Sequence, residues 1–147
     1  MLPENLKILE PVFGLVCWTF LMLLLIAIVR IVAVVRKQLS LSAFQLGESL
    51  QVPEFVRIIN RNYMNLLELP LLFYVACLIV LVTHIYLPII IGLAWVYVIL
   101  RIVHSLIHIT YNNVLHRFTI FALSNFVLLA LWLIIGASLY VRSGSHV

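Results

Sequence analysis

The sequence predicts an all-α integral membrane protein, an antiparallel bundle of four transmembrane helices. Two observations predict this class. Of the 147 residues, 65% are hydrophobic and only 10% are charged, and the mean hydropathy is +1.23. A soluble domain of this length would need more charged surface. The apolar residues also fall into four runs, each long enough to cross a bilayer as a helix. We expect one membrane domain over residues 1–147.

The first helix is expected over residues 11–35. Pro11 is acceptable in a first helical turn, and Arg36 and Lys37 close the apolar run. This run is too long for the core of a cleaved signal and does not end at a small-residue cleavage site, so we expect it to be retained. The second helix is expected over residues 54–82, with a kink at Pro70, because proline removes one backbone hydrogen bond.

The third and fourth helices are expected over residues 88–111 and 117–141. The turn between the second and third helices is short, so these neighbours run antiparallel. The side of the membrane with the loop after the first helix and the turn after the third carries most of the Lys and Arg residues, counting those in the adjoining ends of the helices. The positive-inside rule therefore places these basic loops in the cytoplasm and both termini outside.

A polar face interrupts the apolar pattern at the start of the second helix. Its strongly polar residues fall within roughly one quadrant of a helix; they are Arg57, Arg61, Asn65 and Glu68. The third helix carries a comparable stripe at a similar depth, made of Tyr97, Arg101, His104, His108 and Tyr111. Such faces are unfavourable toward lipid, so we expect them to turn toward each other or toward a neighbouring subunit.

Three interpretations of these polar faces remain open from the residues alone. The arginines can extend to lipid phosphates while Glu68 forms a structural ion pair. His104 and His108 have the spacing of metal ligands, but no third ligand joins them at an obvious spacing, so no metal is expected. The third interpretation is a cytoplasmic-side pocket for a small, mostly anionic molecule, because arginines bind carboxylates by paired hydrogen bonds.

Other site classes find little support. The cations are scattered over the ends of the apolar runs instead of forming a tract, so nucleic acid is not an expected partner. Cys17 and Cys77 lie inside apolar runs and are interpreted as small hydrophobic residues.

The chain resembles the membrane-associated proteins in eicosanoid and glutathione metabolism over nearly its whole length. The motif Arg61-x-x-x-Asn65-x-x-Glu68, followed closely by a proline, carries the resemblance. Arg101-x-x-His104 on the third helix adds to it, as does Arg117 at the start of the fourth. The resemblance implies a homotrimer with glutathione bound as co-substrate between adjacent subunits.

By the same resemblance, each polar residue receives an expected role. Arg117 would be the catalytic cation that stabilises the glutathione thiolate, as a nearby guanidinium favours the anion of a thiol. The residues expected to bind glutathione are Arg61, Asn65, Glu68, His104, Arg36, Arg30, Arg101 and His108. Glutathione would then attack an apolar electrophile or a lipid hydroperoxide that arrives through the bilayer.

Some positions depart from the eicosanoid-specific members. Leu69 stands where the leukotriene branch has a tyrosine, and His108 where the prostaglandin branch has one. Phe118 and Phe121 replace hydroxyl-bearing residues. The resemblance therefore implies a generalist or bacterial member, in a bacterial inner membrane rather than the endoplasmic reticulum. Two other classes stay open: a small proton-coupled transporter that uses Glu68 and the histidines, and a lipid-binding or non-catalytic membrane subunit.

Overall fold

The computed structural model describes Pro3, residues 6–36 and residues 52–144, so Lys37 and most of the predicted basic loop lie outside the described residues. The described residues contain helices and no strand. The helices are α1 (Leu9–Val35), α2 (Glu54–Leu67), α3 (Pro70–Thr83), α4 (Pro88–Ile109) and α5 (Val114–Gly144). Because α2 and α3 together occupy one span, four helical segments are long and apolar enough to cross a membrane. The predicted all-α, four-span fold is confirmed.

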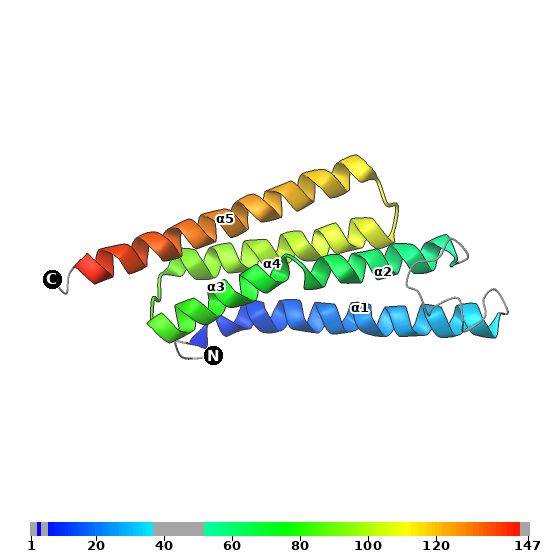
Figure 1. Ribbon diagram of the computed structural model, residues 1–147, viewed down its shortest axis with the longest axis horizontal. Helices are drawn as coiled ribbons and strands as arrows, with labels where there is room; N and C mark the ends of the chain where they lie inside the picture. Colours follow the sequence, from blue (N-terminus) through cyan, green and yellow to red (C-terminus); the bar gives the residue numbers. More distant parts are fainter. Residues whose placement is uncertain (1–2, 4–5, 37–51, 145–147) are drawn as a thin grey trace.

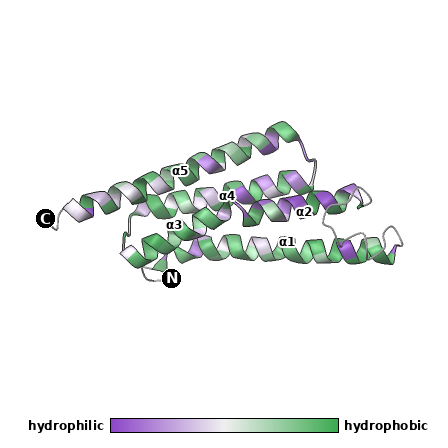
Figure 2. Ribbon diagram, viewed as in Figure 1, coloured by the Kyte–Doolittle hydropathy of each residue, from purple (hydrophilic) through white to green (hydrophobic). Residues whose placement is uncertain are grey.

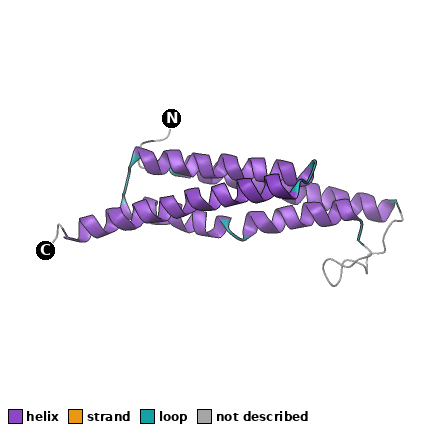
Figure 3. Ribbon diagram, turned by 90° about the horizontal axis from the view of Figure 1, so that it is seen from above, coloured by secondary structure: helices purple, strands orange, loops and turns teal. Residues whose placement is uncertain are grey.

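The helix termini and the turns between helices gather at the two ends of the bundle (Figure 1). We call one the loop end; it holds the end of α1, the start of α2 and the turn between α4 and α5. The other, the terminal end, holds the start of α1, the end of α5 and the turn between α3 and α4, as Figure 3 also shows. Hydrophilic residues gather on α2 and on the loop-end half of α4 (Figure 2).

The second span is broken at Pro70. The sequence predicts a kinked but continuous helix over residues 54–82, whereas the structure ends α2 at Leu67 and begins α3 at Pro70. The backbone N–H of Glu68 still donates to the carbonyl of Met64, at 3.1 Å. Pro70 has no N–H, and its ring would collide with the carbonyl of Leu66 in a continuous helix. The chain therefore starts a new helix there.

The turn between α4 and α5 is tighter than predicted. Helix α4 ends at Ile109 rather than at residue 111, and Asn112 adopts a left-handed conformation with φ of 48°. Helix α5 begins at Val114 rather than at residue 117 because Asn113 caps it. The Asn113 Oδ1 accepts hydrogen bonds from the backbone N–H groups of Leu115 at 3.0 Å and His116 at 3.1 Å.

The core that holds the spans together is apolar and aromatic. Leu15 of α1, Phe73 of α3, Tyr97 of α4 and Leu131 of α5 are all fully buried. The rings of Phe73 and Tyr97 stack with their centroids 4.7 Å apart. This contact packs α3 against α4 in the middle of the bundle. The polar residues nearer the loop end therefore lie next to a closely packed apolar core.

Candidate functional site

A layer of buried polar side chains joins α2 to α4 and α5. Asn62 and Ser105 are fully buried, and the Asn62 Nδ2 donates a hydrogen bond to the Ser105 Oγ at 2.7 Å. Arg101 is also fully buried; its guanidinium donates to the backbone carbonyl of Asn65 and lies over the ring of Phe121, 5.6 Å from the ring centroid. These contacts fix the register of α2 against α4.

Two histidines of α4 lie beside this layer. The Nδ1–H of His104 donates to the backbone carbonyl of Arg117, at 3.1 Å, which ties α4 to the first turns of α5. The ring centroids of His104 and His108 are 6.0 Å apart. Within the described part of the chain, the Nε2 of His104 and both ring nitrogens of His108 are buried and have no hydrogen-bond partner. Buried polar atoms left in this state are candidates for contact with a ligand or water.

Arg117 lies between two cavities at the loop end. The first cavity, of about 280 Å³, is aromatic on one side and is lined by Asn65, His104, Val114, Arg117, Phe118 and Phe121. The second, of about 180 Å³, is strongly polar and is lined by Glu54, Arg57, Ile58, Arg61, His108, Asn112 and Arg117. We call these the aromatic cavity and the arginine cavity. Arg117 is the residue that lines both.

The chain holds Arg117 at several points. Its Nη1 donates to the Oδ1 of Asn112 at 2.6 Å, and its backbone N–H donates to the carbonyl of Asn113 at 3.0 Å. Its own carbonyl accepts the hydrogen bond from His104. The guanidinium is therefore oriented before any ligand arrives, which favours binding because less freedom is lost.

Five of the predicted site residues line these cavities: Arg61, Asn65, His104, His108 and Arg117. Arg101 lines neither cavity. It is fully buried, and its guanidinium donates to the backbone carbonyl of Asn65. The metal interpretation gains nothing from the arrangement, because no group of three or more His, Cys, Asp or Glu residues gathers anywhere in residues 6–36 or 52–144.

Three other predicted residues lie elsewhere in the chain. Glu68 is exposed at the end of α2, and Arg36 is exposed at the end of α1. Arg30 donates to the Oδ1 of Asn60 at 2.9 Å, which joins α1 to α2. None of the three lines the aromatic or the arginine cavity.

Within the chain, α2 turns only part of its polar quadrant toward α4. Asn62 and Leu66 form the buried face of α2, whereas Arg61 and Glu68 are exposed and Asn65 is half-buried. Asn62 follows Arg61 by one position, about 100° around a helix. Helix α2 is therefore rotated about its axis so that the Asn62 amide, and not a row of charged side chains, enters the core.

Sequence reasoning missed several residues of the site. Arg57 was not among the residues expected to bind glutathione, yet it lines the arginine cavity with Arg61 and Arg117. Asn112 was treated only as part of a connection. Consecutive asparagines between two helices are a usable signal, since asparagine favours both left-handed turns and helix N-caps. The spacing of Asn62 and Leu66, one helical turn apart, was the signal for the buried face.

The fold and site define an integral membrane protein with a buried polar centre near one end of a four-span bundle. The model of the MAPEG family matches residues 8–137. Because this match covers most of the chain, the protein belongs to the MAPEG family, membrane proteins of glutathione and eicosanoid metabolism. No curated protein and no solved structure matched the chain in the two other comparisons.

Proposed function

We propose that the protein is a membrane-bound, glutathione-dependent transferase that also reduces lipid hydroperoxides. One observation carries the proposal: Arg117 lines both a cavity suited to an anionic peptide and a cavity suited to an apolar molecule. A transferase that joins a polar thiol to an apolar electrophile needs both environments at one reactive centre. Membership of the MAPEG family supports glutathione as the thiol.

The arginine cavity suits the charged part of glutathione. Three guanidinium groups, those of Arg57, Arg61 and Arg117, line a space that also contains one carboxylate, Glu54, so its cations outnumber its acidic groups. Guanidinium groups bind carboxylates through paired, charge-assisted hydrogen bonds. Glutathione has two carboxylates and one ammonium group, so we assign its carboxylates to Arg61 and Arg57.

The thiol would lie beside Arg117. A thiol with a pKa near 8.5 is mostly protonated at neutral pH, and an adjacent guanidinium favours the thiolate. The thiolate sulfur attacks an electrophilic carbon, a carbon–sulfur bond forms and the leaving group departs with its electron pair. With a hydroperoxide, two glutathione molecules supply the two electrons and become a disulfide, and the hydroperoxide becomes an alcohol and water.

The aromatic cavity gives the second substrate a route from the bilayer. Val114 and Phe118 of α5 line it and are 74% and 66% exposed in one protomer. Since this face of α5 belongs to a membrane-spanning helix, an apolar molecule dissolved in lipid can reach the cavity without crossing water.

One protomer holds only part of this site, so we propose that the protein works as a homotrimer. Each cavity falls below the roughly 300 Å³ at which small-molecule sites begin. Glu68 and Arg36 are exposed and lie outside both cavities. In a trimer, Glu68, Arg36 and Arg30 can complete a site between subunits. Glu68 would then bind the ammonium group of glutathione.

Thiolate formation tests the proposal directly. Purified protein is mixed with glutathione in a stopped-flow instrument, and the ultraviolet absorbance of the thiolate is followed at neutral pH. We expect a thiolate signal with the natural protein. We expect Arg117→Gln to reduce that signal about tenfold, since a lost neighbouring charge moves a thiol pKa by about 1 unit or more.

Arg142→Gln is the matched control, because it removes the same charge from the same helix at the terminal end. It should leave the thiolate signal unchanged. A natural protein that binds glutathione without forming thiolate would indicate a non-catalytic member. An equal loss in both variants would show that Arg117 has no special role, and either result would overturn the proposal.

A further inference from the structure

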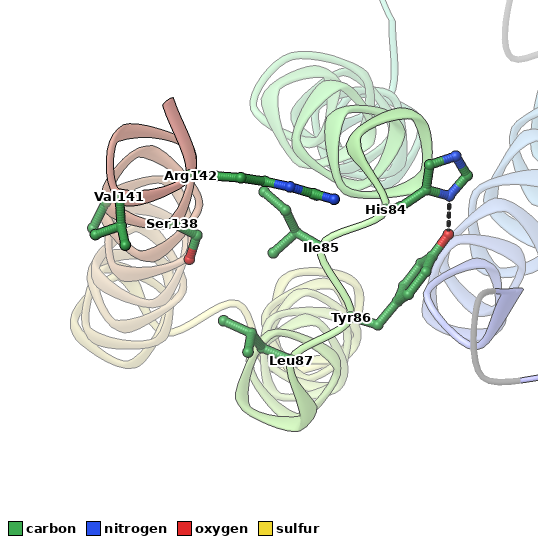
Figure 4. A pocket seen from close by; sticks show the side chains of 8 residues that line it. His84, Ile85, Tyr86, Leu87, Ser138, Val141 and Arg142 are labelled. Carbon is green, nitrogen blue, oxygen red and sulfur yellow. Dashed lines mark hydrogen bonds between the residues drawn. The ribbon is translucent and has the colours of Figure 1, made fainter. Parts of the chain in front are cut away.

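A third cavity lies at the terminal end (Figure 4). The α3–α4 turn and the end of α5, which line it, are at the opposite end of the bundle from the α4–α5 turn (Figure 1). Its volume is about 520 Å³, larger than the aromatic and arginine cavities. It lies between the turn that joins α3 to α4 and the last turns of α5. Its lining residues are His84, Ile85, Tyr86, Leu87, Ala137, Ser138, Val141 and Arg142.

Arg142 crosses this cavity in a fixed position. Its side chain extends from α5 toward the α3–α4 turn (Figure 4), and its Nη1 donates to the backbone carbonyl of Thr83 at 2.6 Å. The contact joins the end of α5 to the last residue of α3. The guanidinium carries several N–H donors in one plane. Because the contact with Thr83 anchors Arg142, the guanidinium keeps one orientation toward an anion in the cavity.

The other polar lining residues are His84, Tyr86 and Ser138. The His84 Nδ1 and the Tyr86 hydroxyl contact each other on the side of the turn that faces away from Arg142 and Ser138 (Figure 4). The Ser138 hydroxyl donates to the carbonyl of Ile134 at 2.7 Å, which leaves its oxygen able to accept. None of the eight lining residues is acidic. The cavity therefore combines the Arg142 cation with hydrogen-bonding side chains and no carboxylate.

The rest of the lining is apolar and lies at one end of the helices that are long and apolar enough to span a membrane. Leu87 and Val141 are 40% and 72% exposed, and Ala137 is exposed beside them. The cavity sits where α3 ends, α4 begins and the apolar part of α5 gives way to Arg142. Lipid headgroups occupy this level of a bilayer, and arginine and tyrosine are the residues that meet them there.

We propose that this cavity binds the headgroup of an anionic phospholipid, with the phosphodiester on Arg142. The glycerol and the first acyl carbons lie against Leu87, Ala137 and Val141, and Ser138 accepts a hydrogen bond from a headgroup hydroxyl. A phospholipid explains the mixture of one cation and an apolar wall better than a free phosphate, which would leave that wall without a partner. The site is independent of glutathione binding.

The test uses delipidated full-length protein in detergent, titrated with phosphatidylglycerol and observed by native mass spectrometry. We expect a phosphatidylglycerol adduct that saturates, and only weak adducts with phosphatidylcholine. Arg142→Gln should weaken binding about tenfold, the effect of losing one charge-assisted hydrogen bond. Ala137→Phe should abolish binding by filling the cavity, and it keeps the Arg142 side chain.

Lys7→Gln is the matched control, because it removes a cation from the same end of the bundle but not from the cavity. The Lys7→Gln variant should keep the phosphatidylglycerol adduct. Retention of the adduct by Arg142→Gln, or an equal loss in Lys7→Gln, would overturn the proposal. Competition by soluble glycerol phosphate at equal concentration would show that the ligand is a free phosphate. If Arg142→Gln or Ala137→Phe changed the number of subunits and left the bound lipid unchanged, the cavity would be a contact between protomers and not a lipid site.

Discussion

Arg117 depends on neighbouring residues for its position, and Asn112 is the neighbour that holds its guanidinium. The hydrogen bond from the Arg117 Nη1 to the Asn112 Oδ1 measures 2.6 Å. Asn112 can offer this acceptor because it adopts a left-handed conformation, with φ of 48°. Glycine is at ease in that conformation, so Asn112→Gly removes the acceptor with little backbone strain.

We therefore expect Asn112→Gly to weaken glutathione thiolate formation about five- to tenfold, the effect of about 1 kcal/mol from one hydrogen bond. The measurement is the glutathione concentration that gives half of the maximal thiolate absorbance. Asn113→Gly makes the same chemical change one residue away. Glycine is tolerated at a helix N-cap, and the backbone carbonyl of residue 113 remains for Arg117. If the two variants bind glutathione alike, Asn112 does not position Arg117.

At the scale of the helix, the break between α2 and α3 decides where Glu68 lies. Glu68 is the C-cap residue directly after α2, with a ψ of −81°, and Pro70 occupies the first turn of α3. Replacing Pro70 by alanine restores the N–H that a continuous helix needs. We expect Pro70→Ala to straighten the span between residues 54 and 83.

Spin labels can measure this change. Nitroxide labels at Phe55 and Val82, both exposed, report the length of the span in a background without Cys17 and Cys77. A straight helix rises about 1.5 Å per residue, so the labels should approach a separation of about 40 Å in Pro70→Ala. Pro88→Ala is the control, because Pro88 begins α4 and interrupts no helical hydrogen bond. An unchanged label distance in Pro70→Ala would show that packing, not proline, breaks the span.

The sequence predicted the elements more reliably than their rotations and ends. Four apolar runs were enough to predict four spans, because length and hydropathy alone decide whether a helix can cross a bilayer. The start of α5 depends on the Asn113 cap, a local hydrogen bond that apolar periodicity does not report. The rotation of α2 depends on Asn62 meeting Ser105 from another helix, and sequence periodicity alone cannot reveal that pairing. The same rotation brings Arg57 into the arginine cavity.

At the scale of the whole molecule, charge is distributed unequally between the two ends. The loop end carries the cations of α1, α2 and α5 that lie near the helix ends: Arg30, Arg36, Arg57, Arg61 and Arg117. Among the described residues, the terminal end carries Lys7, Glu10 and Arg142. Positive charge resists transfer across the membrane during insertion, so we expect the more basic end to lie in the cytoplasm. This orientation would also expose the arginine cavity to cytoplasmic glutathione.

Single cysteines in a background without Cys17 and Cys77 test this orientation. Leu115 at the loop end is 69% exposed, and Ser143 at the terminal end is exposed. A membrane-impermeant maleimide added to intact cells should label Ser143→Cys at once and Leu115→Cys only after the membrane is permeabilised. Both variants should react equally in detergent, which controls for local reactivity. The opposite labelling order would place the arginine cavity outside the cell, and glutathione from the cytoplasm could then not be its ligand.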